Sequence, residues 1–213
     1  MKITRFGHAA LLVETETTRV LIDPGGFCDA PVFDLTDLDA IVVTHQHPDH
    51  CDQERAPALV DANPEATLIC DPETATLVGF GTWLPNSDGR EHQIGDIALR
   101  GVGTQHAVIL AAIPRIANVG VTLTSGGTTV FHPGDTYEYA PAGVDVLAVP
   151  LSAPWAKISE TVDFVQRVAP KAVLPIHDVT IAEAAYELYW GQVIKHGGAA
   201  DARRLGQAES TQF

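Results

Sequence analysis

The segment Thr44-His45-Gln46-His47-Pro48-Asp49-His50 carries the strongest signal in this sequence. It places three histidines and one aspartate within six residues, directly after the apolar run Ala40-Ile41-Val42-Val43. An apolar run of this kind is typical of a buried strand, whose carboxyl end fixes the loop that follows it. Imidazole and carboxylate groups are good ligands for zinc, manganese or iron. The segment therefore predicts a metal-binding loop at the end of a buried strand.

The spacing within the segment divides its ligands between two positions. In an extended stretch, the side chains of His45 and His47 point the same way and can hold one ion together. Pro48 turns the chain, so Asp49 and His50 can face a second ion close by. A solvated loop rich in histidine is the alternative, and the buried strand before the loop argues against it.

Three further candidate ligands also follow strand-like runs. His106 comes after the run 97–105, Asp135 after the run 130–134, and His177 after the run 173–176. Strand ends at a shared sheet edge lie close together in space even when they are far apart in the sequence. Seven ligands suffice for two metal ions and leave room for water.

Short apolar runs separated by Pro and Gly give the order of the elements. In the first half we predict helices at 53–63 and 72–78, and strands at 3–6, 9–13, 19–23, 40–44 and 67–70. In the second half we predict helices at 159–168 and 180–194, and strands at 97–103, 118–124, 128–132, 144–149 and 172–176. Strands followed by helices in both halves favour two sheets with helices outside them, which is a four-layer αββα sandwich of the α/β class.

The length of 213 residues fits one large core, so we expect a single domain over residues 1–198. The polar residues 199–213 are expected to form a C-terminal tail that is partly disordered. No apolar run approaches the roughly 20 residues that a spanning helix needs. Gly7 and His8 break the first apolar stretch, which argues against a secretory signal. We therefore expect a cytoplasmic protein whose three cysteines are reduced.

The formal net charge of −14 weighs against a nucleic-acid partner, because phosphate backbones are bound by basic stripes. Only Arg203-Arg204 brings two cations together, and it stands alone near the C-terminus. We expect a small-molecule substrate, no nucleic acid and no membrane. The oligomeric state stays open, because Tyr186, Tyr189 and Trp190 on the last predicted helix suit either a core or an interface.

The order of the candidate ligands resembles the metallo-β-lactamase superfamily. That order is His-x-His-x-Asp-His, then a histidine, then Gly134-Asp135-Thr136, then a late histidine, and the resemblance runs from Ile22-Asp23-Pro24 to His177. It implies the αββα sandwich of that family. It also implies that His45, His47 and His106 bind a first metal, that Asp49, His50 and His177 bind a second, and that Asp135 bridges them. Gly7-His8-Ala9 and the short chain are most similar to the compact branch that includes ascorbate-6-phosphate lactonase.

The resemblance further implies a metal-dependent hydrolase with two divalent ions, zinc first, with manganese, iron or nickel as alternatives. A hydroxide bridging the ions would cleave a small ester, lactone, amide or phosphodiester. Asp49 is expected to ligate a metal, orient the nucleophile and shuttle its proton. The alternative is a non-catalytic metal-binding sensor or binding protein that keeps the fold. We expect neither the inserted domain of the nuclease members nor the helical C-terminal domain of the thioesterases in a chain of this length.

Five residues near the ligands have two interpretations each. His8 is expected at a hairpin tip, as a substrate contact or proton donor at the mouth of the site, or as an ordinary turn residue. Asp23 is either a carboxylate that orients a ligand imidazole or a turn former. Tyr137 is a candidate hydrogen-bond donor to an oxyanion or a scaffold residue. Trp155 suits a pocket wall and the core equally, and His132 is expected to pack beside the site.

Overall fold

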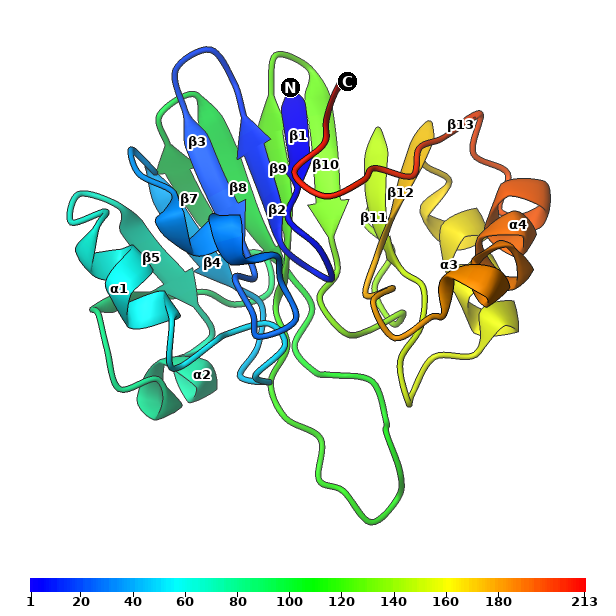
Figure 1. Ribbon diagram of the computed structural model, residues 1–213, viewed down its shortest axis with the longest axis horizontal. Helices are drawn as coiled ribbons and strands as arrows, with labels where there is room; N and C mark the ends of the chain where they lie inside the picture. Colours follow the sequence, from blue (N-terminus) through cyan, green and yellow to red (C-terminus); the bar gives the residue numbers. More distant parts are fainter.

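The computed structural model describes residues 1–213, and its strands form two seven-stranded sheets (Figure 1). The first sheet has the order β14-β1-β2-β3-β4-β5-β6, with β1 Lys2–Arg5, β2 Leu11–Glu14, β3 Arg19–Ile22, β4 Ala40–Val43, β5 Thr67–Cys70, β6 Trp83–Pro85 and β14 Ser210–Gln212. The second has the order β13-β12-β11-β10-β9-β8-β7, with β7 Glu91–Ile94, β8 Ile97–Val102, β9 Gly120–Ser125, β10 Thr128–His132, β11 Val146–Pro150, β12 Ala172–Ile176 and β13 Asp201–Ala202.

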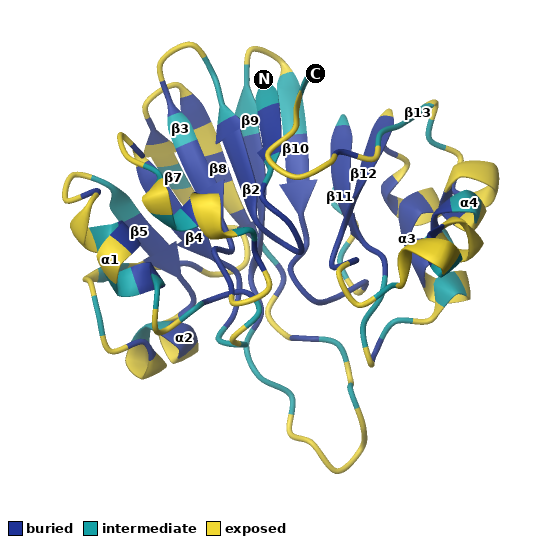
Figure 2. Cartoon of the chain, viewed as in Figure 1, coloured by how far each residue is buried: buried dark blue, intermediate teal, exposed yellow.

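The largest core cluster lies between the two sheets and draws side chains from both. It includes Leu11, Ile22 and Val42 of the first sheet with Leu99 and Val121 of the second, all fully buried. Strands in the middle of each sheet are buried along most of their length (Figure 2). Burying apolar surface from two facing sheets supplies most of the driving force for such a fold.

Helices cover the outer face of each sheet, as Figure 1 shows. The first sheet is covered by the 3-10 helix η1 (Ala30–Asp34), α1 (Ala56–Asp61) and α2 (Pro72–Leu77). The second is covered by α3 (Ile158–Val168), the 3-10 helix η2 (Glu183–Ala185) and α4 (Tyr186–His196). The predicted four-layer αββα sandwich is therefore confirmed.

The apolar face of α3 shows how these helices are held. Thr161, Phe164, Val165 and Val168 are buried, at the spacing that places side chains on one side of a helix. They pack against the outer face of the second sheet together with Trp190 of α4. The helix ends where Ala169 takes a left-handed conformation, with φ of 50°.

Parallel pairing sends several strand ends to the same edge of the molecule. In the first sheet β3, β4, β5 and β6 are parallel, and in the second β10, β11, β12 and β13 are parallel. All four residues of β4 are buried, because a strand between two parallel neighbours and two covered faces has no exposed side. The loop that follows β4 therefore starts from a fixed position.

The structure differs from the sequence prediction at two edge strands and at the start of the last helix, where the sequence pattern is weak. β6 and β7 were not predicted, because both are short edge strands, and β7 has only one buried residue, Ile94. The last helix begins at Tyr186 rather than at residue 180. The residues between form a turn and η2, and the turn is closed by a hydrogen bond from the N–H of Ile181 to the carbonyl of Asp178 (3.0 Å).

The expectation of a partly disordered tail is wrong. Residues 201–202 pair with β12, and residues 210–212 pair with β1 as the edge of the first sheet. The amino group of Met1 donates to the carbonyl of Phe213 at 2.8 Å, so the two ends of the chain meet. Backbone hydrogen bonds hold the two short strands of this segment, and Leu205 is buried while Phe213 packs against the core cluster between the sheets. These scattered contacts leave no periodic hydrophobic pattern in the sequence. No helix in the structure is both long and apolar enough to cross a membrane.

Candidate metal centre

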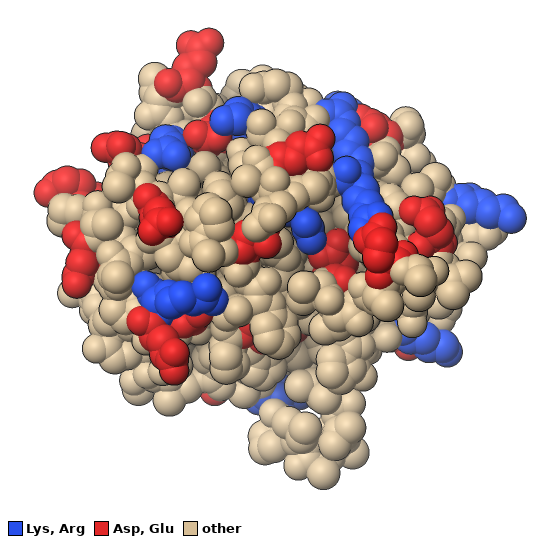
Figure 3. Space-filling view, viewed as in Figure 1, with Lys and Arg blue, Asp and Glu red and all other residues tan.

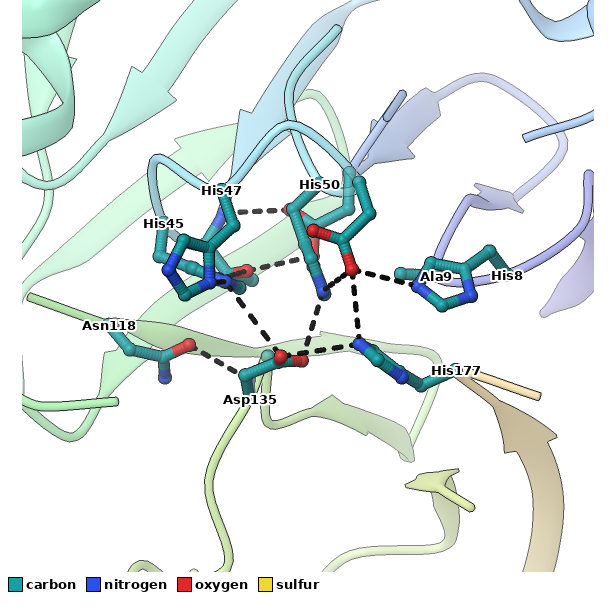
Figure 4. Close-up of polar contacts among 12 residues, drawn as sticks. His8, Ala9, His45, His47, His50, Asn118, Asp135 and His177 are labelled. Atoms are coloured by element: carbon teal, nitrogen blue, oxygen red, sulfur yellow. Dashed lines mark hydrogen bonds and ion pairs between the residues drawn. The ribbon is translucent and has the colours of Figure 1, made fainter. Parts of the chain in front are cut away.

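All seven predicted ligands and His8 lie on loops next to strand ends, and these loops converge (Figure 4). The loop after β4 supplies four of the ligands, and the loops after β8, β10 and β12 supply one each. His8 comes from the connection between β1 and β2. The side chains separate into two groups, within each of which the ligand atoms lie within 4.8 Å of one another: His45, His47, His106 and Asp135, and His8, Asp49, His50 and His177.

Asp135 lies between the two groups. Its Oδ2 is 3.3 Å from Nε2 of His106 and 3.2 Å from Nε2 of His177. Its Oδ1 is 3.0 Å from Nε2 of His50. A carboxylate that reaches both groups is placed to bridge two cations.

The donor atoms of the centre fit divalent cations. Nε2 of His50, His106 and His177 and Oδ1 of Asp135 are buried and make no hydrogen bond of good geometry, although His50 Nε2 and Asp135 Oδ1 lie only 3.0 Å apart. Burying such an atom without a partner costs about 1–3 kcal/mol. One cation satisfies several of these atoms at once, and a set of imidazole and carboxylate donors is the kind that zinc prefers. The residues present therefore fit metal binding.

The opposite ring nitrogens are held by the scaffold. Nδ1 of His106 donates to the carbonyl of the next residue at 2.7 Å. Nδ1 of His177 donates to the carbonyl of Ser152 at 2.6 Å. Nδ1 of His50 donates to Oδ2 of Asp23 at 2.7 Å. Each of these bonds fixes the ring orientation and leaves Nε2 as the atom that faces the centre.

Asp23 orients the first loop as well as one ring. The N–H and the hydroxyl of Thr44 both donate to its carboxylate at 2.7 Å, and His50 supplies a third donor. The side chain is fully buried. Of the two interpretations of Asp23, the structure supports the carboxylate that orients a ligand imidazole.

His8 is fully buried rather than exposed at the mouth of the site. Its Nε2 lies 3.1 Å from Oδ2 of Asp49, and its ring centroid is 4.0 Å from that of His177. Its carbonyl accepts a hydrogen bond from the N–H of His177 at 2.9 Å. His8 therefore belongs to the second group of donors and contacts Asp49 and His177 directly.

Three non-glycine residues of the centre have backbone conformations that are rare for such residues. The φ angles are 47° at His8, 50° at Asp23 and 53° at His177. The left-handed region costs roughly 1–2 kcal/mol per residue, and it persists only where the surrounding structure fixes it. Strain gathered at one place in this way is characteristic of functional sites.

Close packing of charged groups shifts their pKa values. Burial favours a higher pKa for Asp49, but the neighbouring His177 and His8 rings outweigh it and hold the pKa well below its usual range. Burial favours a lower pKa for His177, but the charge of Asp135 outweighs it and raises the pKa to about 9. Burial holds the pKa of His45 well below its usual value. Burial favours a higher pKa for Asp135 too, but the charges of His50 and His177 outweigh it and hold the pKa well below its usual range. Both carboxylates therefore stay ionised and supply negative charge to a cation.

Two of the lesser candidates belong to the scaffold. The hydroxyl of Tyr137 donates to the carbonyl of Pro150 at 2.6 Å and lies 2.8 Å from the hydroxyl of Thr161, so it is not free to bind an oxyanion. Nε2 of His132 donates to the carbonyl of Ala9 at 2.9 Å, so the expected packing role is confirmed.

Two other residues contact Asp135 directly. The indole of Trp155 donates to Oδ2 of Asp135 at 3.0 Å. The backbone N–H of Asp135 donates to Oδ1 of Asn118 at 2.9 Å. Sequence reasoning left Trp155 undecided and missed Asn118. Asn118 was predicted as the first residue of the strand 118–124, whereas β9 begins at Gly120, and no pattern in the sequence marked its contact with Asp135.

Known proteins are similar to this chain over most of its length. The family described as Beta-lactamase superfamily domain matches residues 2–177. Protein Rv0786c from Mycobacterium tuberculosis is 42% identical over 91% of each chain. A UPF0173 metal-dependent hydrolase from Archaeoglobus fulgidus is 30% identical over 83% of each chain.

Solved structures share the fold at lower identity. The metallo hydrolase Igni18 from Ignicoccus hospitalis has a TM-score of 0.75 at 21% identity, covering 100% of this chain and 98% of its own. The metallo-beta-lactamase fold protein YhfI from Bacillus subtilis has a TM-score of 0.74 at 13% identity, covering 99% and 98%. At these identities the similarity establishes the architecture alone.

Proposed function

Because this chain belongs to the β-lactamase superfamily and is a metal-dependent hydrolase, we propose that it cleaves an ester, lactone, amide or phosphodiester bond of a small molecule at a centre of two divalent metal ions. The observation that carries the proposal is the pair of donor groups that meet at Asp135. A reducing compartment such as the cytoplasm fits the three buried, unpaired thiols.

We assign His45, His47 and His106 to the first ion, Asp49, His50 and His177 to the second, and Asp135 to both. Support comes from the unpartnered Nε2 atoms and from the two groups of donors within 4.8 Å. Zinc is the first expectation because most of the donors are imidazoles, and manganese, iron and nickel accept the same donors.

Ions held here would supply a water nucleophile of lowered pKa and positive charge against a developing oxyanion. The chain's own contribution is to fix the donors and to handle the proton. Asp49 is the least buried carboxylate of the centre, with 22% of its side chain exposed. We propose that its Oδ2 accepts the proton of the attacking water. His8 is a positioning residue, because its Nε2 holds that same oxygen.

The test is hydrolysis of a panel of small esters, lactones and phosphodiesters before and after metal removal. We expect activity to disappear on chelation and to return when zinc or manganese is added back. His106→Ala should abolish the activity, whereas His196→Ala, at an exposed histidine outside the centre, should not change it. A chain that binds two ions yet cleaves nothing in a broad panel would contradict the catalytic proposal and favour the metal-binding sensor.

A further inference from the structure

A pocket of about 600 Å³ adjoins the metal centre and shares Trp155 with it. One edge of the Trp155 indole donates to Asp135, and the ring also lines the pocket. The apolar part of the lining includes Val108 and Trp155, and the polar part includes Glu160 and Asp163. The Trp155 indole therefore lies between the pocket and the carboxylate that joins the two donor groups.

The pocket is tied to the metal ligands through the backbone as well. Ala107 directly follows the ligand His106, and Thr136 directly follows the ligand Asp135. The N–H of Ala107 donates to the carbonyl of Asp135 at 2.8 Å. The wall of the pocket is therefore built on the same two loops as the ligands His106 and Asp135.

The loop that begins at the pocket is apolar and exposed. Residues 107–114 contain no charged side chain, and Val108, Leu110 and Ile113 are exposed by 55%, 56% and 44%. In Figure 1 this loop is the long green segment below the sheets, and in Figure 3 a projection without charged side chains at its tip occupies the same place. Apolar side chains exposed beside a concave polar site are typical of a ligand-binding surface.

The polar part of the lining is negatively charged. Glu138 is paired with Arg115 at 2.7 Å, which leaves the carboxylates of Glu160 and Asp163 against one guanidinium, that of Arg167. The guanidinium of Arg167 donates to the backbone carbonyls of Tyr137 and Glu138, so the main chain takes two of its N–H donors. A negatively charged group would meet repulsion here, and the overall charge of −14 adds to it.

We propose that this pocket binds an apolar group of the substrate and selects a substrate that is neutral or positively charged at that end. The pocket thus narrows the substrate class within the proposed hydrolase function, on which this inference rests. Val108 and Trp155 supply the apolar contact, and Glu160 and Asp163 disfavour anions.

Binding of three six-carbon probes tests the pocket without requiring catalysis. We would titrate the purified full-length protein with 1-hexanol, hexylamine and hexane-1-sulfonate and measure Kd by NMR or calorimetry. We expect the alcohol and the amine to bind at least about tenfold more tightly than the sulfonate. Shortening the alcohol should weaken binding by up to about fourfold per buried methylene. Equal or tighter binding of the sulfonate would overturn the proposal.

Matched variants locate the binding. Val108→Ser should weaken 1-hexanol binding several-fold, whereas Val179→Ser, at a valine exposed to 54%, should leave it unchanged. In the double variant Glu160→Gln/Asp163→Asn, the Kd of hexane-1-sulfonate should become close to the Kd of hexylamine. Equal effects of the two valine variants would overturn the assignment to this pocket.

A parallel kinetic series separates this inference from the proposed function. The 4-nitrophenyl esters of acetate, hexanoate, 6-aminohexanoate and adipate differ only in the group that would enter the pocket. We expect hexanoate and 6-aminohexanoate to be cleaved at least about tenfold faster, by kcat/KM, than acetate or the adipate monoester. Probe selectivity without cleavage of any substrate would refute the hydrolase function alone, whereas cleavage without the expected selectivity would refute the subsite alone.

Discussion

The indole Nε1 of Trp155 lies 3.0 Å from Oδ2 of Asp135 and donates a hydrogen bond to it. The same oxygen is 3.3 Å or less from ring nitrogens of His106 and His177. Trp155 is itself buried against Tyr137 and Phe164 in the core cluster under α3. A side chain anchored in the core therefore fixes the orientation of the carboxylate at the middle of the metal centre.

Trp155→Phe should weaken metal binding while preserving the fold. The phenyl ring keeps much of the apolar contact but cannot donate to Asp135. Loss of a partner that orients a ligand typically costs 10–100-fold in metal affinity, so we expect a loss of at least about tenfold. Competition with a chromophoric chelator measures the zinc affinity of each variant. Trp83→Phe is the control, because it removes an indole bond to the carbonyl of Phe80 outside the centre. Equal zinc affinities in the two variants would refute the role of Trp155.

Asp23→Asn should also weaken metal binding, because Asp23 orients the ligand His50. Asparagine tolerates the left-handed backbone at this position, where φ is 50°, but it offers the ring and Thr44 no negative charge. We expect a loss of about 10–100-fold in metal affinity. Asp71→Asn is a matched buried control, because asparagine also caps α2 through the N–H groups of Glu73 and Thr74. The interpretation fails if Asp71→Asn lowers metal affinity as much as Asp23→Asn does.

Gly134→Ala should destabilise the protein more than Gly143→Ala. Both glycines have positive φ, 63° and 77°, so alanine at either position costs roughly 1–2 kcal/mol. A Cβ at Gly134 would lie 2.3 Å from Oδ1 of Asn118, whereas at Gly143 it would meet nothing within 4 Å. Overpacking adds roughly 1–3 kcal/mol to the first variant alone. Denaturant unfolding measures the loss of unfolding free energy in both variants. Equal losses would show that the close approach of Asn118 to Gly134 does not destabilise the alanine variant.

Glu14 should make a small, pH-dependent contribution to stability. Burial favours a higher pKa, but hydrogen bonds from Lys2 (2.8 Å) and Arg19 (3.1 Å) outweigh it and lower the pKa of Glu14 below its ordinary value of 4.5. A lowered pKa in the folded state means that the stabilisation is present above about pH 4.5 and is lost as the pH falls through the lowered value.

The corresponding measurement is the free energy of unfolding of wild type and Glu14→Gln against pH, both in chelator so that metal loss does not contribute. The difference should be at most about 1 kcal/mol at neutral pH and should vanish in acid. Glu54→Gln, at an exposed glutamate that forms no salt bridge, should show no such dependence. A difference that grows in acid would mean that the pKa of Glu14 is raised in the folded state rather than lowered.

The candidate ligands were predictable because their chemistry is local and their strands are strongly marked. The run 40–43 is apolar throughout, and a strand buried on both faces leaves that pattern in the sequence. His106, Asp135 and His177 each follow a strand, so the edge of the fold brings them together.

Residues that act by orienting others could not be found in this way. Asn118 holds Asp135 through a long-range contact, and the indole of Trp155 reaches the same carboxylate from a loop after β11. Neither residue lies in a repeating pattern, and only the packed structure shows its partner. The C-terminal strands were missed for a related reason, since backbone pairing rather than side-chain hydrophobicity holds residues 210–212.

The number of metal ions per chain tests the central claim most directly. We would count ions by elemental mass spectrometry in wild type, Asp135→Ala and the control Asp61→Ala, each purified and then supplied with zinc or manganese. The dinuclear centre predicts about two ions per chain in wild type and in Asp61→Ala, and fewer in Asp135→Ala. A wild-type chain that stays empty after both metals are supplied would contradict the metal centre and the hydrolytic mechanism proposed from it.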